Sequence, residues 1–154
     1  MHPLTGSWKL VWNELRGVRH PMGHIPTYLT HISMKTLPMY PCIVTSLHQH
    51  IDVERQVWID SLDVIIPDTE TEASWTVVGR LKKTPDVEMP SMLEIEYERG
   101  RLTAKNPPAW LVEYTESTIP LRGRGKAMTV TLNDVYRLDR DMHQRSAYLE
   151  RIQI

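Results

Sequence analysis

Alternation of apolar and polar residues is the dominant pattern of the chain. The clearest case is 92–99, where Leu93, Ile95 and Tyr97 alternate with three glutamates. Because successive side chains of a strand point to opposite faces, this pattern predicts a half-buried strand with a charged outer face. Gly100 then predicts a hairpin turn into 101–104. Similar patterns predict strands over 7–13, 43–53, 56–66, 73–82, 110–115, 128–138 and 146–152.

Segments with turn composition separate these strands. Pro67-Asp68, Pro85-Asp86, 106–108 and 122–125 are rich in Pro, Gly, Asp or Asn. Eight or nine strands joined by short turns form an antiparallel meander, which removes its edges most simply by closing into a barrel. The predicted fold is therefore all-β, an up-and-down barrel of about eight strands formed by 1–154 as one domain.

The stretch 17–41 breaks the alternation. Its prolines, Pro21, Pro26, Pro38 and Pro41, exclude a long helix and a central strand. A short helix is expected only within 27–36. After the first strand of a barrel, such a segment predicts a lid over one end, and a simple cover with no ligand role is the alternative.

Charge and composition exclude several function classes. Lys plus Arg number 18 and Asp plus Glu 19, so the net charge of −1 disfavours nucleic acid as a partner. No apolar stretch is long enough to cross a membrane and 1–6 lacks a signal-peptide pattern, so we expect a soluble intracellular protein without an integral membrane segment. Cys42 is the single cysteine, which excludes an internal disulfide. We expect no cofactor, because neither a phosphate-binding glycine loop nor a dinucleotide fingerprint is present.

Candidate ligand-binding residues come from the aromatic composition and from strand parity. The chain has no Phe but five Trp, six Tyr and eight Met, a set that suits a cavity wall as well as a core. Parity over 43–53 favours Leu47 and its row facing inward, which places Gln49 inside the barrel. The residues predicted to line a cavity, with ordinary packing as the alternative for each, are Gln49, Trp58, Trp75, Tyr97, Trp110, Tyr114 and Tyr136.

Candidate catalytic groups are carboxylates within apolar strand segments. Asp60 and Glu113 are the predicted acid–base residues, with Asp63 a further case, because an apolar wall raises the pKa of a carboxyl group. His48 and His50 share a strand face, but no third ligand can be assigned to them, so no metal site is predicted.

Three segments resemble a known superfamily. Gly6-Ser7-Trp8, followed by 9–12, resembles the opening of the lipocalin and fatty-acid-binding (calycin) superfamily. The segments 49–52 and 132–140 resemble the plastid-lipid-associated protein, or fibrillin, branch, although Thr131 replaces the usual Tyr and 141–144 replaces a Gly-Lys-Gly turn. A second, weaker resemblance, in 4–12, 21–23 and 28–29, is to lipocalin-like proteins found with microbial biosynthetic enzymes.

The resemblance implies a lipocalin-like barrel that carries a lipophilic metabolite of isoprenoid, carotenoid, quinone or polyketide type. The alternative is a cofactor-free cyclase or isomerase that acts on such a substrate in the same cavity. The expected partner is a small hydrophobic molecule, and a homodimer through the edge near the Pro-rich segment stays open. Independently of family, Trp8 is expected to close one end of the barrel beneath Arg137 or Arg140.

Overall fold

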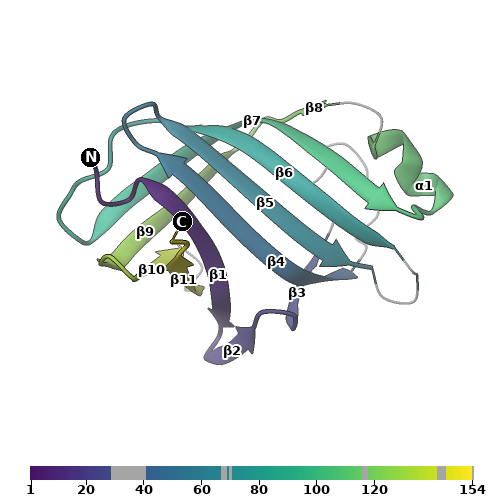
Figure 1. The fold of residues 1–154 in the computed structure, drawn as a ribbon, viewed down its shortest axis with the longest axis horizontal. Helices are drawn as coiled ribbons and strands as arrows, with labels where there is room; N and C mark the ends of the chain where they lie inside the picture. The colour runs from purple at the N-terminus through teal and green to yellow at the C-terminus, as the bar shows by residue number, and fades with distance from the viewer. Residues whose placement is uncertain (29–40, 67–68, 70, 116–117, 142–144, 154) are drawn as a thin grey trace.

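A computed structural model describes residues 1–28, 41–66, 69, 71–115, 118–141 and 145–153. Strands dominate it, and the helical part consists of α1 (Ala109–Val112) and the 3-10 turn η2 (Glu113–Thr115) (Figure 1). The strands are β1 (Gly6–Leu15), β2 (Val18–Pro21), β3 (Ile25–Tyr28), β4 (Pro41–Asp52), β5 (Val57–Ile65), β6 (Glu72–Leu81), β7 (Ser91–Lys105), β8 (Ile119–Pro120), β9 (Arg124–Leu132), β10 (Tyr136–Asp141) and β11 (Ser146–Arg151).

Eight of these strands form a closed antiparallel barrel. The hydrogen-bonded order is β1-β11-β10-β9-β7-β6-β5-β4, and β4 pairs back onto β1 from Gly6↔Ile51 to Lys9↔His48. The closure confirms the predicted fold class, and the architecture is compatible with a lipocalin-like fold. No helix among the described residues has the length and apolarity needed to span a membrane.

The Pro-rich stretch contributes two short strands where β1 and β4 diverge. The second half of β1 pairs with β2, and the first half of β4 pairs with β3. Pro21 and Pro26 therefore lie at the ends of the strand order, where a missing backbone N–H is tolerated. Of the expected helix over 27–36, the first two residues belong to β3 and the others lie outside the described residues.

The predicted hairpin turn at Gly100 is wrong. β7 runs without interruption through this glycine, and the extra residue Glu98 forms a bulge opposite Val78 and Gly79. The reason is packing against the neighbouring strand β6, because a Cβ on Gly100 would lie 2.2 Å from the indole of Trp75. This glycine makes room for a large side chain inside a strand.

Two other strand predictions fail for local reasons. The segment 110–115 is helical rather than extended, which buries Leu111 while Val112 and Glu113 face solvent. The predicted single strand 128–138 is two strands, because the Asn133 side chain accepts hydrogen bonds from the backbone N–H groups of Val135 and Tyr136 and ends β9 in a turn.

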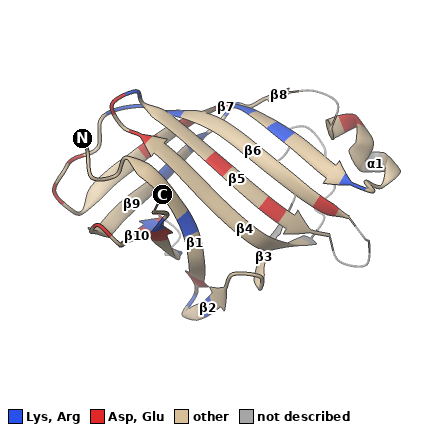
Figure 2. Cartoon of the chain, in the orientation of Figure 1, with Lys and Arg blue, Asp and Glu red and all other residues tan. Residues whose placement is uncertain are grey.

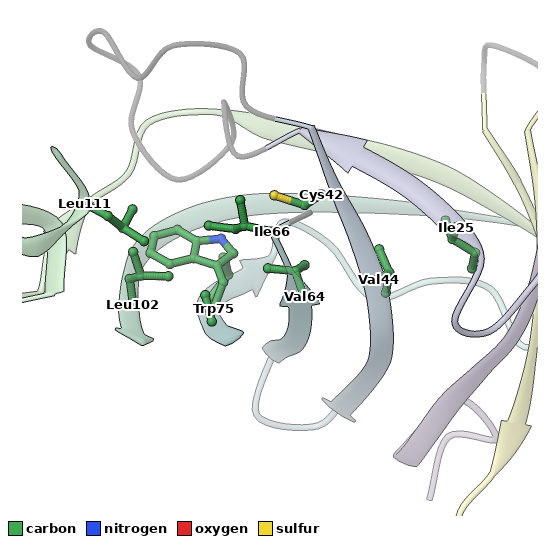
Figure 3. Close-up of a cluster of buried hydrophobic side chains, with 10 residues drawn as sticks. Ile25, Cys42, Val44, Val64, Ile66, Trp75, Leu102 and Leu111 are labelled. Atoms are coloured by element: carbon green, nitrogen blue, oxygen red, sulfur yellow. The ribbon is translucent and has the colours of Figure 1, made fainter. Parts of the chain in front are cut away.

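The barrel interior holds two apolar clusters. One lies at the α1 end, where Leu111 packs beside Trp75 and Leu102 (Figure 3). The other surrounds Trp8 at the opposite end and includes Trp58. Charged residues of both signs are interspersed along the strands in the view of Figure 2, which gives no large field of one sign there.

Candidate functional site

Trp8 closes one end of the barrel between two arginines. Its indole N–H donates to the carbonyl of Leu4 at 3.1 Å, and the guanidinium carbons of Arg151 and Arg137 lie 4.2 and 5.0 Å from its ring centroid. Gly6 has a φ of +144°, and a Cβ there would lie 2.6 Å from the Arg151 guanidinium. Gly6 of the Gly-x-Trp segment is therefore required for two reasons: its backbone has a positive φ, and the Arg151 guanidinium lies too close for a side chain.

The arginine prediction for this closure is only partly correct. Arg137 does lie over Trp8, whereas Arg140 is exposed. Arg151 is the nearer partner, and it also donates to the carbonyls of Thr5 and Pro3 at 3.0 and 2.7 Å. These bonds tie the last strand to the start of the chain.

An apolar cavity of about 390 Å³ lies against strands β4 to β7 and the segment 121–124. Its wall is formed by Leu47, Leu62, Trp75, Val77 and Leu121. The segment 122–124, with two exposed arginines, lies at its rim. This volume and lining suit the body of a small apolar molecule.

A second, polar cavity of about 270 Å³ adjoins the apolar one. Asp60 and Tyr97 line both cavities, so they stand at the junction. The polar cavity also has Asn13, Gln49 and Asp139 in its wall. A molecule that extended from one cavity to the other would place an apolar part and a polar part beside matching surfaces.

Asp60 carries the most perturbed carboxyl group of this site. Burial raises the pKa of Asp60 from 3.8 to about 6, against the opposing effects of a hydrogen bond from Trp58, the charge of Arg137 and the side chain of Gln49. The Trp58 indole N–H donates to Oδ2 at 2.9 Å, while Oδ1 is buried without a hydrogen-bond partner among the described residues. Trp58 therefore fixes one oxygen, and Gln49 is a further side chain that acts on this carboxyl group.

Tyr97 provides a neutral hydroxyl beside this carboxyl group. Burial, with a contribution from the charge of Asp60, raises the pKa of Tyr97 to about 12. The hydroxyl thus keeps its proton at neutral pH and can donate a hydrogen bond. Gly125 leaves room for it, because a Cβ there would lie 2.6 Å from the Tyr97 oxygen.

Arg137 binds two residues in the wall of the polar cavity. Its side chain is fully buried, and its Nη2 lies 3.1 Å from Asp139 Oδ2 and donates to Gln49 Oε1. Thr129 Oγ1 donates to the other Asp139 oxygen at 2.8 Å. Burial lowers the pKa of Arg137, whereas Asp139 and Asp60 favour its charged form. The guanidinium therefore holds Gln49 and Asp139 in place.

The structure brings together five of the residues selected from the sequence. Gln49 does face inward, as parity predicted, while His48 and His50 are exposed on the other face. The five residues that line the two cavities are Gln49, Trp58, Asp60, Trp75 and Tyr97.

The other candidates lie elsewhere. The ring of Tyr136 is tilted against that of Tyr148, with ring centroids 5.3 Å apart, and Tyr136 is not in the wall of either cavity. Glu113 is exposed on η2, outside any strand. Tyr114, also on η2, packs against the apolar cluster at the α1 end. Trp110 belongs to α1, but its side chain lies outside the described residues.

The sequence-based selection missed Asn13 and Asp139, and it assigned Arg137 to the barrel closure rather than to the polar cavity. In β10 the charged residues Arg137 and Asp139 point inward, and the apolar Leu138 lies between them, opposite to the expected parity. The signal that could have found them was the spacing of an arginine and an aspartate two residues apart, which can pair on one strand face.

Two further groups do not form sites. Among the described residues, no group of three or more His, Cys, Asp or Glu side chains is placed to hold a metal ion. Cys42 lies in the apolar cluster at the α1 end, where burial raises the pKa of its thiol to about 11. Its reactive thiolate form is therefore disfavoured.

Comparisons with known proteins assign neither a family nor a function to this chain. The chain matches no family model, and no curated protein and no solved structure matches it either.

Proposed function

We propose that this barrel binds a small lipophilic metabolite in its interior. The observation that carries the proposal is the apolar cavity of about 390 Å³ between β4, β5, β6 and the segment after β8. A closed barrel of eight strands is compatible with ligand binding. The resemblance to fibrillins favours a ligand of isoprenoid, carotenoid, quinone or polyketide type.

The apolar wall supplies the binding free energy in this proposal. Leu47, Leu62 and Trp75 present flat or branched apolar surface, and burying such surface contributes about 25 cal/mol per Å². The polar groups at the junction supply orientation. Asp60 and Tyr97 would fix which end of the ligand lies deepest.

Native mass spectrometry of protein expressed in its own host tests this function. We expect an unaltered lipophilic molecule at near-equal stoichiometry with the wild-type chain. Leu62→Trp fills the apolar cavity, so the added mass of a bound molecule should be absent from the spectrum of this variant. Ile65→Trp is the matched control, because Ile65 is on the same strand and 40% exposed. Equal ligand content in all three proteins, or none in any, would contradict the proposal.

A cofactor-free isomerase or cyclase is the second candidate, and the state of Asp60 favours it. A carboxyl group with a pKa of about 6 can take and return a proton near neutral pH. In such a reaction the Asp60 carboxylate removes a proton from a carbon next to a ligand carbonyl, and Tyr97 donates a hydrogen bond to the enolate oxygen. The same proton then returns to another carbon, so no oxidant or reductant is needed.

The enzyme candidate has its own test. Host extract is incubated in D₂O with wild-type protein or with Asp60→Asn, and the isolated molecule is analysed by mass spectrometry. Catalysis predicts deuterium at carbon and an isomerised product with wild type only. Recovery of one unlabelled molecule from both incubations would support a carrier and eliminate the enzyme.

A further inference from the structure

The polar cavity contains acceptor atoms that lack hydrogen-bond partners. Asp60 Oδ1 and Asn13 Oδ1 are both buried, both belong to residues of this cavity wall, and neither has a partner among the described residues. They come from different strands, β5 and β1. A buried acceptor without a donor costs free energy, so these two oxygens favour a group that donates to both.

Arg137, whose charge acts on Asp60, is only partly paired: its Nη2 has partners, whereas its Nε and Nη1 are buried with none among the described residues, and Arg137 is not part of the wall of the polar cavity. Arg137 pairs with Asp139 and donates to Gln49, and it lies over the rings of Trp8 and Trp58. A ligand carboxylate in this cavity would meet the carboxyl groups of Asp60 and Asp139, whereas the basic side chains of the wall, Lys126 and Arg145, are exposed. The arginines at 122 and 124 lie at the rim of the other cavity.

We propose that the polar cavity takes a hydrogen-bond-donating group of the ligand, a hydroxyl or a protonated amine, between Asp60 and Asn13. The inference rests on the proposed ligand-binding function and adds to it the chemistry of the ligand's polar end. The apolar body then extends past Tyr97 toward Leu62 and Trp75. Carboxylates and groups that only accept hydrogen bonds are disfavoured by the same two oxygens.

Four probes with a common ten-carbon chain test this selectivity: decan-1-ol, decylamine, decyl methyl ether and decanoate. Dissociation constants are measured with the full chain by tryptophan fluorescence titration, which Trp58 and Trp75 report. We expect the alcohol and the amine to bind at least about tenfold more tightly than the ether and decanoate. The order of alcohol and amine tells which of the two donors fits better.

Asp60→Asn should reverse the preference. The Asn oxygen can accept from Trp58 as Asp60 Oδ2 does, which turns the amide NH₂ toward the cavity in place of a free acceptor. The ether should then gain affinity and the amine should lose it. Asp63→Asn, on the outer face of the same strand, is the control and should leave all four constants unchanged. Asn13→Ala removes the second acceptor and should weaken alcohol and amine only.

The outcomes separate this inference from the proposed function. If the ether and decanoate bind as tightly as the alcohol, and Leu62→Trp blocks all of them, the donor preference is wrong and the binding function stands. If the alcohol preference survives Asp60→Asn and Asn13→Ala, the assignment to these oxygens is wrong. If no probe binds, or Leu62→Trp changes nothing, the proposed function itself fails.

Discussion

Replacement of Asp60 by Asn should change the stability of the barrel in a pH-dependent way. Burial raises the pKa of Asp60 from 3.8 to about 6 in the folded chain, whereas the unfolded chain has the ordinary value. Between these values the folded state holds a proton that the unfolded state has released. Stability therefore falls as the pH rises through this window, and the full cost is present above pH 6.

The size of the effect follows from the two pKa values. A difference of about two between the values 3.8 and about 6 corresponds to about 3 kcal/mol of unfolding free energy at pH 8. Asn has the same shape and no charge to desolvate. We therefore expect the stability of Asp60→Asn relative to wild type to rise by about 2–3 kcal/mol between pH 4 and pH 8.

Urea unfolding of both proteins at several pH values measures this difference. Other carboxylates titrate equally in both proteins and cancel. Asp63→Asn should show the opposite sign, because hydrogen bonds from Ser74 and Ser46 lower the pKa of Asp63 and stabilise the folded state above its unfolded pKa. A stability difference for Asp60→Asn that stayed constant with pH, or that fell toward pH 8, would refute the reasoning.

Three further predictions concern packing and buried charge. Gly100→Ala places a Cβ 2.2 Å from the Trp75 ring, so thermal unfolding should show a loss of about 1–3 kcal/mol, and an unchanged melting temperature would contradict this. Arg137→Met leaves Asp139 buried without its cation and should cost about 3–5 kcal/mol in urea unfolding, with Asp139→Asn recovering part of the loss; additive losses would contradict the pairing. Cys42, 1% exposed with a pKa of about 11, should react with a disulfide reagent only as fast as the chain unfolds, and fast modification in native buffer would show a different environment.

The barrel could be predicted from the sequence because several strands alternate cleanly. In β4 the inward row of Leu47, Gln49 and Ile51 follows from parity alone, and closure follows from the number of strands. Gly100 shows where local signals mislead. A glycine in an alternating segment predicts a turn, but here it accommodates Trp75 of the neighbouring strand. That contact depends on tertiary packing.

The candidate site could be predicted only in part. Asp60 could be selected from the sequence as a candidate acid–base residue because it interrupts an apolar strand segment. The inward direction of Asp139 could not be selected, because the rule that apolar residues face inward assigns Tyr136 and Leu138 to the interior. The buried ion pair reverses this rule. Thr129, which is paired with Asp139 on the neighbouring strand β9, donates a hydrogen bond to Asp139, and Gln49 on β4 accepts one from Arg137. Such a network forms only when the barrel closes, so it could not be predicted from the sequence.

Contacts between the bound decan-1-ol chain and protein methyl groups test the central claim most directly. Nuclear Overhauser effects would be recorded on methyl-labelled protein saturated with this alcohol. The account predicts contacts from the alkyl chain to Leu62 and Val77, which line the apolar cavity, and none to the exposed Ile65 or Val135. Contacts to Ile65 or Val135 alone would place the alcohol outside the barrel and contradict a ligand-binding interior.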